Sequence, residues 1–392
     1  MADFSQITDY IKSLYPEMDP VLLHCPQFLG NEKKYLNECI DTKFVSYVSH
    51  FVTDMEDHIK KLTGAKCAVA MVSGTEALHM AFVAAGVKAG EEVISQPLTF
   101  AATSAVIVNC GAIPVYVDVD RDTMGMSPKS LKKFLENNTK QEGGKCINKN
   151  TGRVISACVP MHTFGHPCRI DEIRAICDEH NLMLIEDAAE SVGSFYKGKH
   201  TGTFGKVSIL SFNGNKTLTT GGGGMLLTDD EELAARAKYL STTAKEPAKW
   251  GYYHKVAGWN LRMPGVNAAI GAAQLEYFDK IIENKRETAQ MYKKFFAELN
   301  IPFVTETENS RANYWLNAIL LKDREEREQF LEFTNSNGIQ TRPIWTLMYK
   351  MPPYEKCEHG DMTNSEWLED HLVNIPSSVR TSLQAGAYCQ VE

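Results

Sequence analysis

Short apolar runs separated by helical stretches dominate the chain from Ala68 onward. Each run has the length of a strand, and helical spacing follows most of them, so the pattern predicts strands that alternate with crossover helices. Such alternation is typical of an open, mainly parallel sheet covered on both faces. The last run follows the sixth with no room for a crossover helix, and we expect it to be antiparallel to its neighbour. The seven predicted strands are 68–72, 92–96, 113–118, 154–160, 182–186, 207–212 and 223–228.

Helical patterns flank this predicted sheet on both sides. Apolar residues spaced three or four apart at 4–14 predict a short helix that Pro16 ends. This arm can pack on a partner or on its own chain, and the sequence does not separate the two. A polar stretch at 139–153 predicts a surface loop. The other predicted helices are 33–40, 47–62, 229–240 and a long one at 266–299.

The end of the chain predicts a second, smaller α/β unit. A strand-like stretch at 313–321 is followed by a helical stretch at 325–337 and a turn at 341–343. At 392 residues the chain is long enough for two hydrophobic cores. We therefore predict a helical arm at 1–25, a large domain at 26–265 and a small domain at 266–392.

Composition and charge exclude several classes of protein. Hydrophobic residues at 43% and charged residues at 23% are ordinary for a globular protein. A net charge of −8 gives no basic footprint for nucleic acid, so an anionic substrate has to be bound by local groups. The ten cysteines contain no CxxC pair and no zinc-type spacing, so we expect no metal site and a reducing compartment. The chain has no signal-peptide pattern and no apolar stretch near the about 18 residues of a membrane span, so we expect a cytoplasmic protein without membrane contact.

Lys216 is the residue around which the candidate chemistry is organised. It stands in SILSFNGNKTLTTGGGGMLL (208–227), between two strand-like runs and ahead of four consecutive glycines. The glycines leave room for a flat group close to the backbone. Partial burial lowers the pKa of a lysine amine and frees its nucleophilic form, which a Schiff-base lysine requires. The alternative is a solvated lysine in a flexible surface turn.

Asp187 strengthens the first interpretation. It follows the apolar run at 182–185, so it lies at the carboxyl end of a predicted parallel strand, where α/β proteins bind ligands. A buried carboxylate needs a cation. The ring nitrogen of pyridoxal phosphate supplies one, and a Schiff-base lysine with such an aspartate is the pairing expected for this cofactor. The alternative is an aspartate that caps the next helix.

A candidate phosphate site lies at Ser73-Gly74-Thr75. These residues follow the first predicted strand and open a helix, where free backbone N–H groups and the helix dipole favour an anion. Gly74 allows close approach, Thr75 offers a hydroxyl, and Ser211 adds a second hydroxyl from the strand before Lys216. The alternative is an ordinary helix N-cap by Ser73 or Thr75.

Five motifs carry a family resemblance. In chain order they are SGTEAL, PLTFAAT, EDAAES, SFNGNK-x4-GGGGM and GWNLRM. From about residue 26 to the C-terminus the chain resembles the DegT/DnrJ/EryC1/StrS family of sugar-nucleotide aminotransferases, which are fold type I pyridoxal phosphate enzymes. The segment HCPQFLGNEKKYLNECIDTKFVS and the quadruple glycine resemble its LegC-type branch, which aminates a 4-keto-6-deoxy sugar nucleotide on the way to legionaminic-acid-like sugars. Many relatives have Glu where this chain has Gly222, a departure that affects the branch and not the chemistry.

The resemblance implies roles for three more residues at the cofactor. Phe100 matches the aromatic residue that stacks on the pyridine ring. Glu190 is expected to contact either the ring hydroxyl or the next turn of its own helix. Asn260 matches the asparagine that reaches the cofactor phosphate from the other subunit, although Leu261 departs from the Asn-Tyr-Arg pattern of relatives.

Three residues are candidates for substrate binding. His162 and His166 follow the fourth predicted strand in MHTFGHP, and the alternative for both is a hydrogen-bonded structural histidine. Arg342 resembles a family position near the substrate entrance, and the alternative is a surface arginine.

These features together predict a homodimeric aminotransferase with shared active sites. By resemblance it moves an amino group from an amino acid, L-glutamate, to C4 of a nucleoside-diphosphate 4-keto-6-deoxyhexose with a 2-acetamido group. Lys216 is expected to bind the cofactor and move the proton, and Asp187 to keep the ring nitrogen protonated. The alternatives are a 3-keto sugar-nucleotide aminotransferase, a sugar dehydratase of the same family, which needs another residue in place of Lys216, and a regulatory homologue without turnover. The choice between UDP and GDP stays open.

Overall fold

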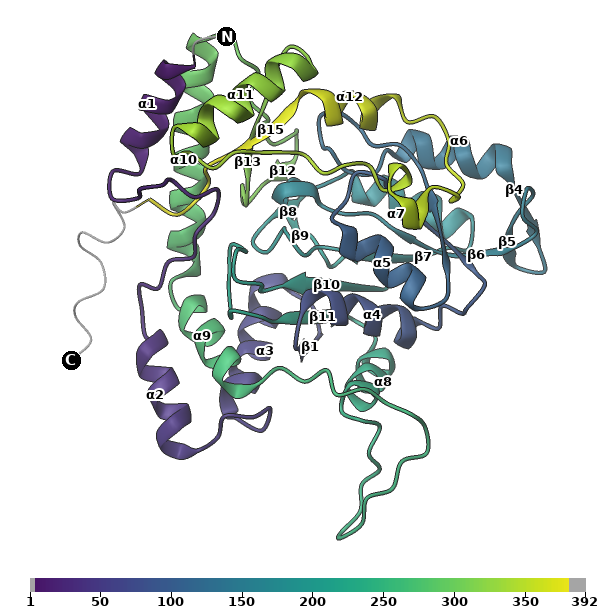
Figure 1. Ribbon diagram of the computed structural model, residues 1–392. Coiled ribbons are helices and arrows are strands. Elements are labelled where there is room, and N and C mark those ends of the chain that lie inside the picture. The colour runs from purple at the N-terminus through teal and green to yellow at the C-terminus, as the bar shows by residue number, and fades with distance from the viewer. Residues whose placement is uncertain (1–3, 381–392) are drawn as a thin grey trace.

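The seven strands that the apolar runs predict lie side by side in one continuous sheet, which has nine strands in all. The computed structural model describes residues 4–380, and the ends of the predicted arm and small domain, at 1–3 and 381–392, lie outside the described residues. The strand order is β1-β11-β10-β7-β6-β2-β3 (Figure 1). β11 is antiparallel to both neighbours and the other pairs are parallel, which confirms the predicted fold type I sheet. The strands are β1 (Cys67–Met71), β2 (Glu92–Ser95), β3 (Ile113–Tyr116), β6 (Val154–Val159), β7 (Met183–Asp187), β10 (Val207–Ser211) and β11 (Gly224–Thr228).

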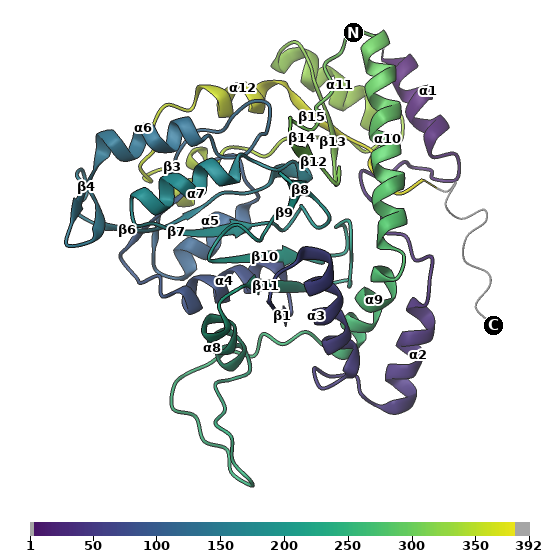
Figure 2. The same ribbon diagram turned by 180° about the vertical axis from the view of Figure 1, so that it is seen from behind.

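Helices cover both faces of this sheet (Figures 1 and 2). One face packs against α4 (Gly74–Ala85), α5 (Ala101–Asn109) and α8 (Glu231–Ser241). The other packs against α3 (His50–Thr63), α6 (Pro128–Asn138), α7 (Ile170–Glu179) and α9 (Gly265–Leu275). Successive strand residues point to opposite faces, so Val69 joins the first core and its neighbour Ala70 the second. The continuous apolar runs follow from this burial on two sides.

A second, smaller sheet lies beside the long helix α10 (Phe278–Glu298). Its strand order is β13-β15-β14, with both pairs antiparallel. The elements of this part are β13 (Asn317–Leu320), α11 (Arg324–Ser336), β14 (Arg342–Pro343), α12 (Thr363–His371) and β15 (Leu372–Ile375). This arrangement is the predicted second α/β unit, while the exact domain boundaries stay predictions.

The N-terminal helix α1 (Ser5–Leu14) packs on its own chain. Ile7 and Ile11 join the core between α10, α11 and the small sheet, and the Phe4 ring meets the Phe330 ring edge-on at 5.1 Å. Figure 1 shows α1 beside α10 and α11. The sequence left open whether this helix packs on a partner or on its own chain. The structure shows that it packs on its own chain. The next helix, α2 (Glu32–Thr42), packs on α9.

The predicted surface loop at 139–153 is wrong. This stretch forms a hairpin of β4 (Thr139–Glu142) and β5 (Lys145–Asn148), and β5 pairs with the start of β6. Gly143 and Gly144 supply the two positive φ angles, 58° and 75°, that a tight two-residue turn needs. The turn signal was present in the sequence as Gly-Gly between two polar but extended stretches.

Two further expectations are corrected by tertiary contacts. The predicted helix at 266–299 is broken into α9 and α10, because Tyr277 has a φ of −127° and its hydroxyl donates to the carboxylate of Glu32. The predicted turn at 341–343 contains the edge strand β14, in which Arg342 lies opposite Asn374. A short sheet of β8 (Phe195–Tyr196), β9 (Lys199–His200) and β12 (Ser310–Arg311) was not predicted at all.

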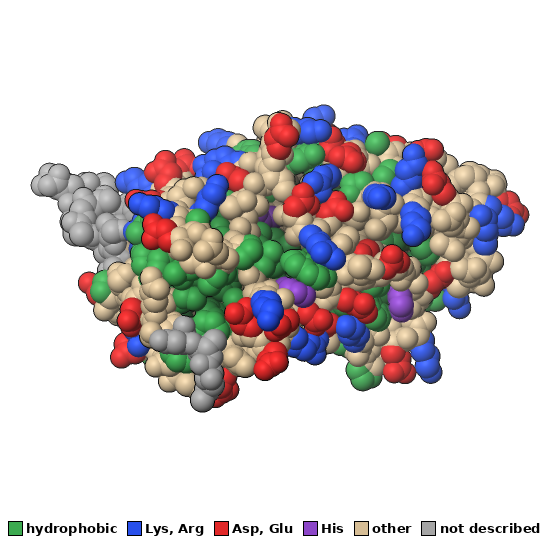
Figure 3. All heavy atoms as spheres, turned by 90° about the horizontal axis from the view of Figure 1, so that it is seen from above, with side chains coloured by type: hydrophobic (Ala, Val, Ile, Leu, Met, Phe, Trp, Pro, Cys, Tyr) green, Lys and Arg blue, Asp and Glu red, His purple; other side chains and the backbone are tan. Residues whose placement is uncertain are grey.

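The surface carries a mixture of charges. Figure 3 shows basic and acidic side chains interspersed over the face seen from above, without a large field of one sign. Among residues 4–380, no helix combines the length and the apolar character needed to cross a bilayer.

Candidate active site

A cavity of about 810 Å³ lies where β7 and β10 end and α4 begins, and the small sheet closes its other side. Parallel strands present their carboxyl ends at one edge of the sheet, so residues far apart in sequence meet here. Eight of the residues that the sequence predicts line this cavity: Gly74, Thr75, Phe100, Asp187, Glu190, Ser211, Lys216 and Arg342. Asn260, His162 and His166 do not line it.

Lys216 reaches this cavity from the turn after β10. Its backbone N–H donates to the carbonyl of Asn213, which closes the turn. Its Nζ atom donates to Oε1 of Glu190 at 3.1 Å and lies 3.7 Å from the centre of the Trp315 ring. Only 12% of the side chain is exposed. The solvated surface lysine that was the alternative is therefore not what the structure contains.

Asp187 ends β7 as a buried carboxylate without an ion-pair partner among the described residues. Its Oδ2 accepts a hydrogen bond from Thr103 Oγ1 at 2.7 Å, and its Oδ1 accepts one from the Ala189 N–H at 3.2 Å. Burial raises the pKa of Asp187, and these hydrogen bonds and the charge of Lys216 oppose the rise. No helix begins here, so Asp187 is not a helix cap. Such a carboxylate fits a cationic partner like the ring nitrogen of pyridoxal phosphate.

Glu190 is the direct partner of the lysine. Its Oε2 accepts a hydrogen bond from the Phe164 N–H at 2.8 Å, while its Oε1 faces Lys216. Burial raises the pKa of Glu190 to about 7, and the charge of Lys216 opposes this. The residue lies in a turn, so the expected contact within its own helix does not exist.

The start of α4 is pressed against the end of β10. A Cβ atom on Gly74 would lie 2.7 Å from Cβ and 2.9 Å from Oγ of Ser211, so only glycine permits this approach. Ser73 is the N-cap, and its Oγ accepts from the Glu76 N–H at 3.1 Å. The capping role that was the alternative is thus real. It leaves the first N–H groups of α4, with the Thr75 and Ser211 side chains, on the cavity as a cradle that fits a phosphate.

Phe100 stands at the N-terminal end of α5 with 53% of its surface exposed. Its ring contacts the Trp345 ring edge-on, with centres 6.3 Å apart. The ring is therefore on the cavity wall and not in the core, as a stacking residue would require.

The two histidines are buried and do not line the cavity, which favours the alternative of structural histidines over contact with the substrate. His162 is fully buried, its Nε2 lies 3.0 Å from Oε2 of Glu186, and its Nδ1 accepts from the Cys168 N–H at 3.3 Å. Burial alone lowers the pKa of His162, but Cys168 and Glu186 raise it overall. His166 is packed edge-on against the Tyr314 ring at 5.1 Å, and burial lowers its pKa to about 4.

Asn260 and Arg342 lie at the periphery. Asn260 is exposed, and its Oδ1 accepts a hydrogen bond from Nε of Arg262 at 2.8 Å. Arg342 lines the cavity from β14, where its Nη1 donates to Oδ1 of Asn335 at 2.9 Å and to the Thr341 carbonyl at 2.8 Å. It is thus a surface arginine and a cavity residue at once.

Sequence reasoning missed the far wall of the cavity. Trp315, Trp345, His24 and Asn374 all line it. Lys285, fully buried, donates to Nε2 of His24 at 3.0 Å and to the Trp315 carbonyl at 3.2 Å, so it joins two of these wall residues. His24 opens the segment that resembles the LegC-type branch, but nothing in that segment predicted a place in the cavity. The other residues stand in no motif, because they reach the cavity only when the small sheet packs on the large one.

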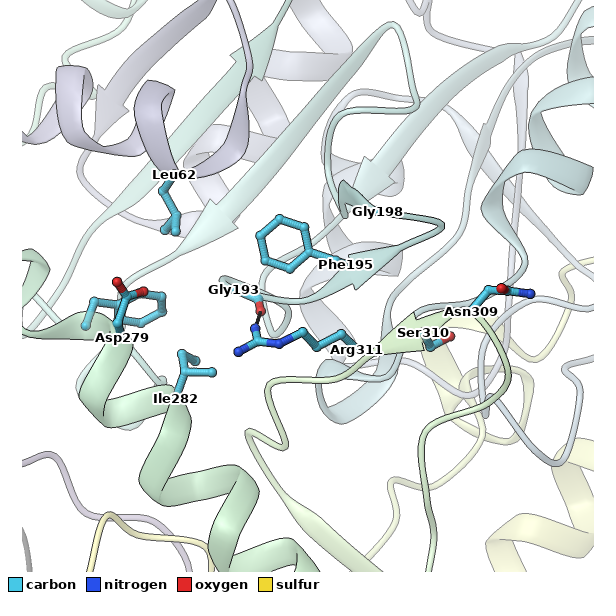
Figure 4. A pocket seen from close by; sticks show the side chains of 10 residues that line it. Leu62, Gly193, Phe195, Gly198, Asp279, Ile282, Asn309, Ser310 and Arg311 are labelled. Atoms are coloured by element: carbon cyan, nitrogen blue, oxygen red, sulfur yellow. Dashed lines mark hydrogen bonds between the residues drawn. The ribbon is translucent and has the colours of Figure 1, made fainter.

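A second cavity, of about 470 Å³, lies between α3, α10 and the short β8–β9 hairpin. Figure 4 shows Arg311 directed at the carbonyl of Gly193, with Leu62, Phe195 and Ile282 around it. None of the predicted site residues lines this cavity. The candidate chemistry therefore belongs to the larger cavity alone.

The sheet order and the presence of Lys216 and Asp187 in one cavity define the class of protein: a pyridoxal phosphate-dependent enzyme of fold type I. Residues 27–388 match the sequence model of the DegT/DnrJ/EryC1/StrS aminotransferase family, and the chain belongs to this family. It is a pyridoxal phosphate-dependent sugar aminotransferase, in agreement with the resemblance seen in the motifs.

Named relatives agree with this assignment. The chain is 36% identical to the GDP-perosamine synthase of Vibrio cholerae, over 90% of this chain and 92% of that protein. It is also 36% identical to the GDP-perosamine synthase of Escherichia coli O157:H7, over 92% and 94%. Among solved structures, DesI in the presence of its TDP-sugar product superimposes with a TM-score of 0.80 at 25% identity, covering 92% of this chain and 88% of that chain.

Proposed function

We propose that this protein transfers an amino group from L-glutamate to C4 of a nucleoside-diphosphate 4-keto-6-deoxyhexose, with a 2-acetamido group on the sugar. The observation that carries the aminotransferase part is the placement of the Lys216 amine, held by Glu190 in a cavity that also contains Asp187, a carboxylate without an ion-pair partner among residues 4–380. A dehydratase of this family needs another residue in place of Lys216. A regulatory homologue without turnover does not need Lys216, Glu190 and Asp187 together in one cavity.

The residues of the cavity fit the cofactor. Pyridoxal phosphate, when bound, supplies an aldehyde carbon for amines and a ring that takes up electrons. Asp187 would pair with the ring nitrogen, and Phe100 would lie against the ring. The N-terminus of α4 at Gly74 and Thr75, with Ser211, would hold the phosphate.

Proton transfer falls to Lys216. Its Nζ is the group that we propose takes up and returns the proton of the α-carbon of the amino donor. Glu190 lies 3.1 Å from this Nζ, and the Phe164 N–H fixes the carboxylate. Since burial raises the pKa of Glu190 to about 7, its carboxyl can hold or release a proton beside the lysine near neutral pH.

The substrate assignment rests on three supports. The names of the relatives join a nucleoside diphosphate to a sugar, as GDP-perosamine and as a TDP-sugar. Arg342, an exposed residue that lines the cavity, offers a cation to a diphosphate. Gly222 also lines the cavity, and the nearest atom to a Cβ placed there is 4.0 Å away, which leaves space for a substituent such as the acetamido group. The acetamido group itself rests on the resemblance to the LegC-type branch.

We also propose a cytoplasmic homodimer in which Asn260 reaches the cofactor phosphate of the other subunit. Asn260 is exposed and does not line its own cavity. Nearby, the Arg262 guanidinium lies 4.0 Å from the centre of the exposed Tyr47 ring. Exposed apolar side chains in the same region suit a covering subunit: Phe44, Val45, Tyr47, Val48 and Val72. Nine free thiols in the described residues suit a reducing compartment.

The test is direct amination. A 4,6-dehydratase generates the 4-keto sugar nucleotide in UDP and GDP versions, and the protein is added with L-glutamate and pyridoxal phosphate. We expect a 4-amino product with one of the two nucleotides. If the protein aminates a 3-keto sugar nucleotide and neither 4-keto compound, the C4 assignment is overturned. If it aminates neither the 4-keto nor the 3-keto sugar nucleotides, the substrate class is overturned.

A further inference from the structure

The indole of Trp315 and the carboxylate of Glu190 hold the Lys216 amine between them. Nζ lies 3.7 Å from the centre of the Trp315 ring and 3.1 Å from Oε1 of Glu190. A cation over the face of an indole is attracted by the negative face of the ring, and Trp is the best partner for such a contact. Trp315 lies in none of the five sequence motifs, and no role was predicted for it.

Trp315 is fixed by hydrogen bonds that do not involve the Lys216 amine. Its Nε1 donates to the carbonyl of Asn215 at 2.7 Å, and its backbone N–H donates to Oδ1 of Asn313 at 2.8 Å. Its own carbonyl accepts from Nζ of the buried Lys285 at 3.2 Å. Only 5% of the residue is exposed. These contacts hold the ring face in place beside the amine.

The same segment also fixes the other partner. Asn313 donates from Nδ2 to the carbonyl of Glu190 at 2.9 Å, and to that of Val192 at the same distance. The three residues 313–315 thus connect the small sheet to the Glu190 backbone, to the turn that carries Lys216 and to the amine itself. A residue that only filled space would not need these directed contacts.

We propose that Trp315 is a positioning residue that holds the ammonium form of Lys216 whenever this amine is not attached to the cofactor. The need for such a place rests on the proposed function, in which the lysine attaches and detaches during each turnover. A free ammonium on a side chain that is only 12% exposed has lost most of its water. The indole face replaces part of that solvation and keeps the amine close to where it acts.

The test measures the amine itself and needs no turnover. The full-length chain, freed of cofactor by dialysis against hydroxylamine, is labelled with trinitrobenzenesulfonate, which reacts with unprotonated amines. Labelling of Lys216 is quantified by peptide mass spectrometry against the exposed Lys43. At about pH 7.5, Trp315→Leu should label Lys216 about tenfold faster than wild type, and Trp315→Phe, which keeps a ring face, within about threefold.

Two controls separate charge from access. Trp345→Leu removes another tryptophan of the same cavity that contacts Phe100 and Phe164 and makes no ring contact with Lys216, so its labelling rate should match wild type. The acceleration in Trp315→Leu relative to wild type should shrink as the labelling pH is raised from about 7.5 to about 11, because an indole face attracts the ammonium form and not the neutral amine. The other titratable groups around Nζ are Glu190, Asp187 and His24, and all variants retain them.

A holoenzyme measurement completes the test. In single turnovers with L-glutamate, Trp315→Leu should lower the rate constant about tenfold with glutamate affinity unchanged within about twofold, and Trp315→Phe should restore most of the rate. Equal labelling of wild type and Trp315→Leu at pH 7.5, or the same acceleration at both pH values, would overturn the proposal. Because labelling requires no sugar substrate, a failed amination test leaves this result intact, and a failed labelling test leaves the proposed function intact.

Discussion

Thr103 donates a hydrogen bond of 2.7 Å from its Oγ1 to Oδ2 of Asp187, and among the described residues this is the one side-chain hydrogen bond that Asp187 makes. Both residues are buried, and no cationic side chain in the described part of the chain forms an ion pair with the carboxylate. Burial accordingly raises the pKa of Asp187. The chain therefore keeps a carboxylate in a place that is unfavourable for its charge, which is typical of a functional group and not of a stabilising one.

Asp187→Asn should separate activity from stability. The amide oxygen can still accept the hydrogen bond from Thr103, while the cost of a buried charge disappears. We expect the cofactor-free protein to unfold at the same or a higher temperature at pH 8, while turnover falls by at least about a hundredfold because the ring nitrogen loses its partner. Differential scanning calorimetry and single-turnover kinetics give the two numbers. Unchanged single-turnover rates would mean that another residue pairs with the ring.

Lys216→Ala should abolish transamination and leave the fold intact. One amine both binds the aldehyde and moves the proton, so no other side chain compensates. Pyridoxamine phosphate should still bind without a covalent bond, as isothermal titration would show. The matched control is Lys206→Ala, which removes an exposed lysine paired with Asp230 and should keep wild-type turnover. Near-native turnover in Lys216→Ala would exclude this site.

Glu190 should make stability depend on pH near neutrality. Burial raises the pKa of this carboxyl from 4.5 to about 7. The folded protein therefore holds an extra proton between these values, so the contribution to stability is fully present below about pH 4.5 and is lost as the pH rises through about 7. Compared with Glu190→Gln, the free energy of unfolding of the wild type should fall by about 3 kcal/mol between pH 5 and pH 8, measured in urea.

Removing the opposing charge provides the control for this prediction. The charge of Lys216 works to lower the pKa of Glu190. In a Lys216→Met background, the stability difference between the chain that keeps Glu190 and the chain with Glu190→Gln should therefore continue to grow above pH 8. Parallel stability curves for the wild type and Glu190→Gln would show instead that the carboxyl stays ionised across this range.

Gly74→Ala should weaken cofactor binding through the phosphate cradle. The new Cβ would lie 2.7 Å from Cβ of Ser211, so α4 and β10 have to separate. We expect the dissociation constant of pyridoxal phosphate to rise at least about tenfold, measured by fluorescence titration. Gly222→Ala is the matched control, because its nearest neighbour would be 4.0 Å away and affinity should stay within about twofold. Equal effects of both substitutions would argue against a phosphate site at Gly74.

Mixed dimers should reveal whether Asn260 acts across the subunit interface. When an inactive Lys216→Ala subunit pairs with an Asn260→Ala subunit, a cross-subunit contact places both defects in one site and leaves the other site intact. Mixed dimers should then recover about half of the wild-type activity. Recovery limited to the residual activity of Asn260→Ala would place the contact within its own subunit.

The sheet could be predicted because its strands are buried on both faces. Burial on two sides demands continuous apolar runs, and the lack of room before the last run at 223–228 required an antiparallel neighbour, which is β11. The long helix at 266–299 could not be predicted correctly, because its break at Tyr277 depends on Glu32, which is distant in sequence.

The cofactor side of the cavity was predictable and the far wall was not. Lys216, Asp187 and Gly74 all stand at strand ends or helix starts, where topology alone brings residues together. Trp315 and Trp345 reach the cavity from the small sheet, and no local pattern distinguishes them from core tryptophans. Strand alternation gave a signal about Glu186: it precedes Asp187 at the end of a predicted strand, so its carboxylate points to the opposite face of the sheet from Asp187. His162 contacts this carboxylate and therefore lies away from the cavity.

The β4–β5 hairpin offers a permissive site for an inserted label. Cβ atoms on Gly143 and Gly144 would meet no atom within 4 Å, and the turn lies at the end of the molecule far from α1 and α10 (Figure 1). Loop tips of this kind tolerate inserted peptides. An affinity peptide placed between these glycines would mark one kind of subunit without disturbing α1, and it would allow mixed assemblies to be purified.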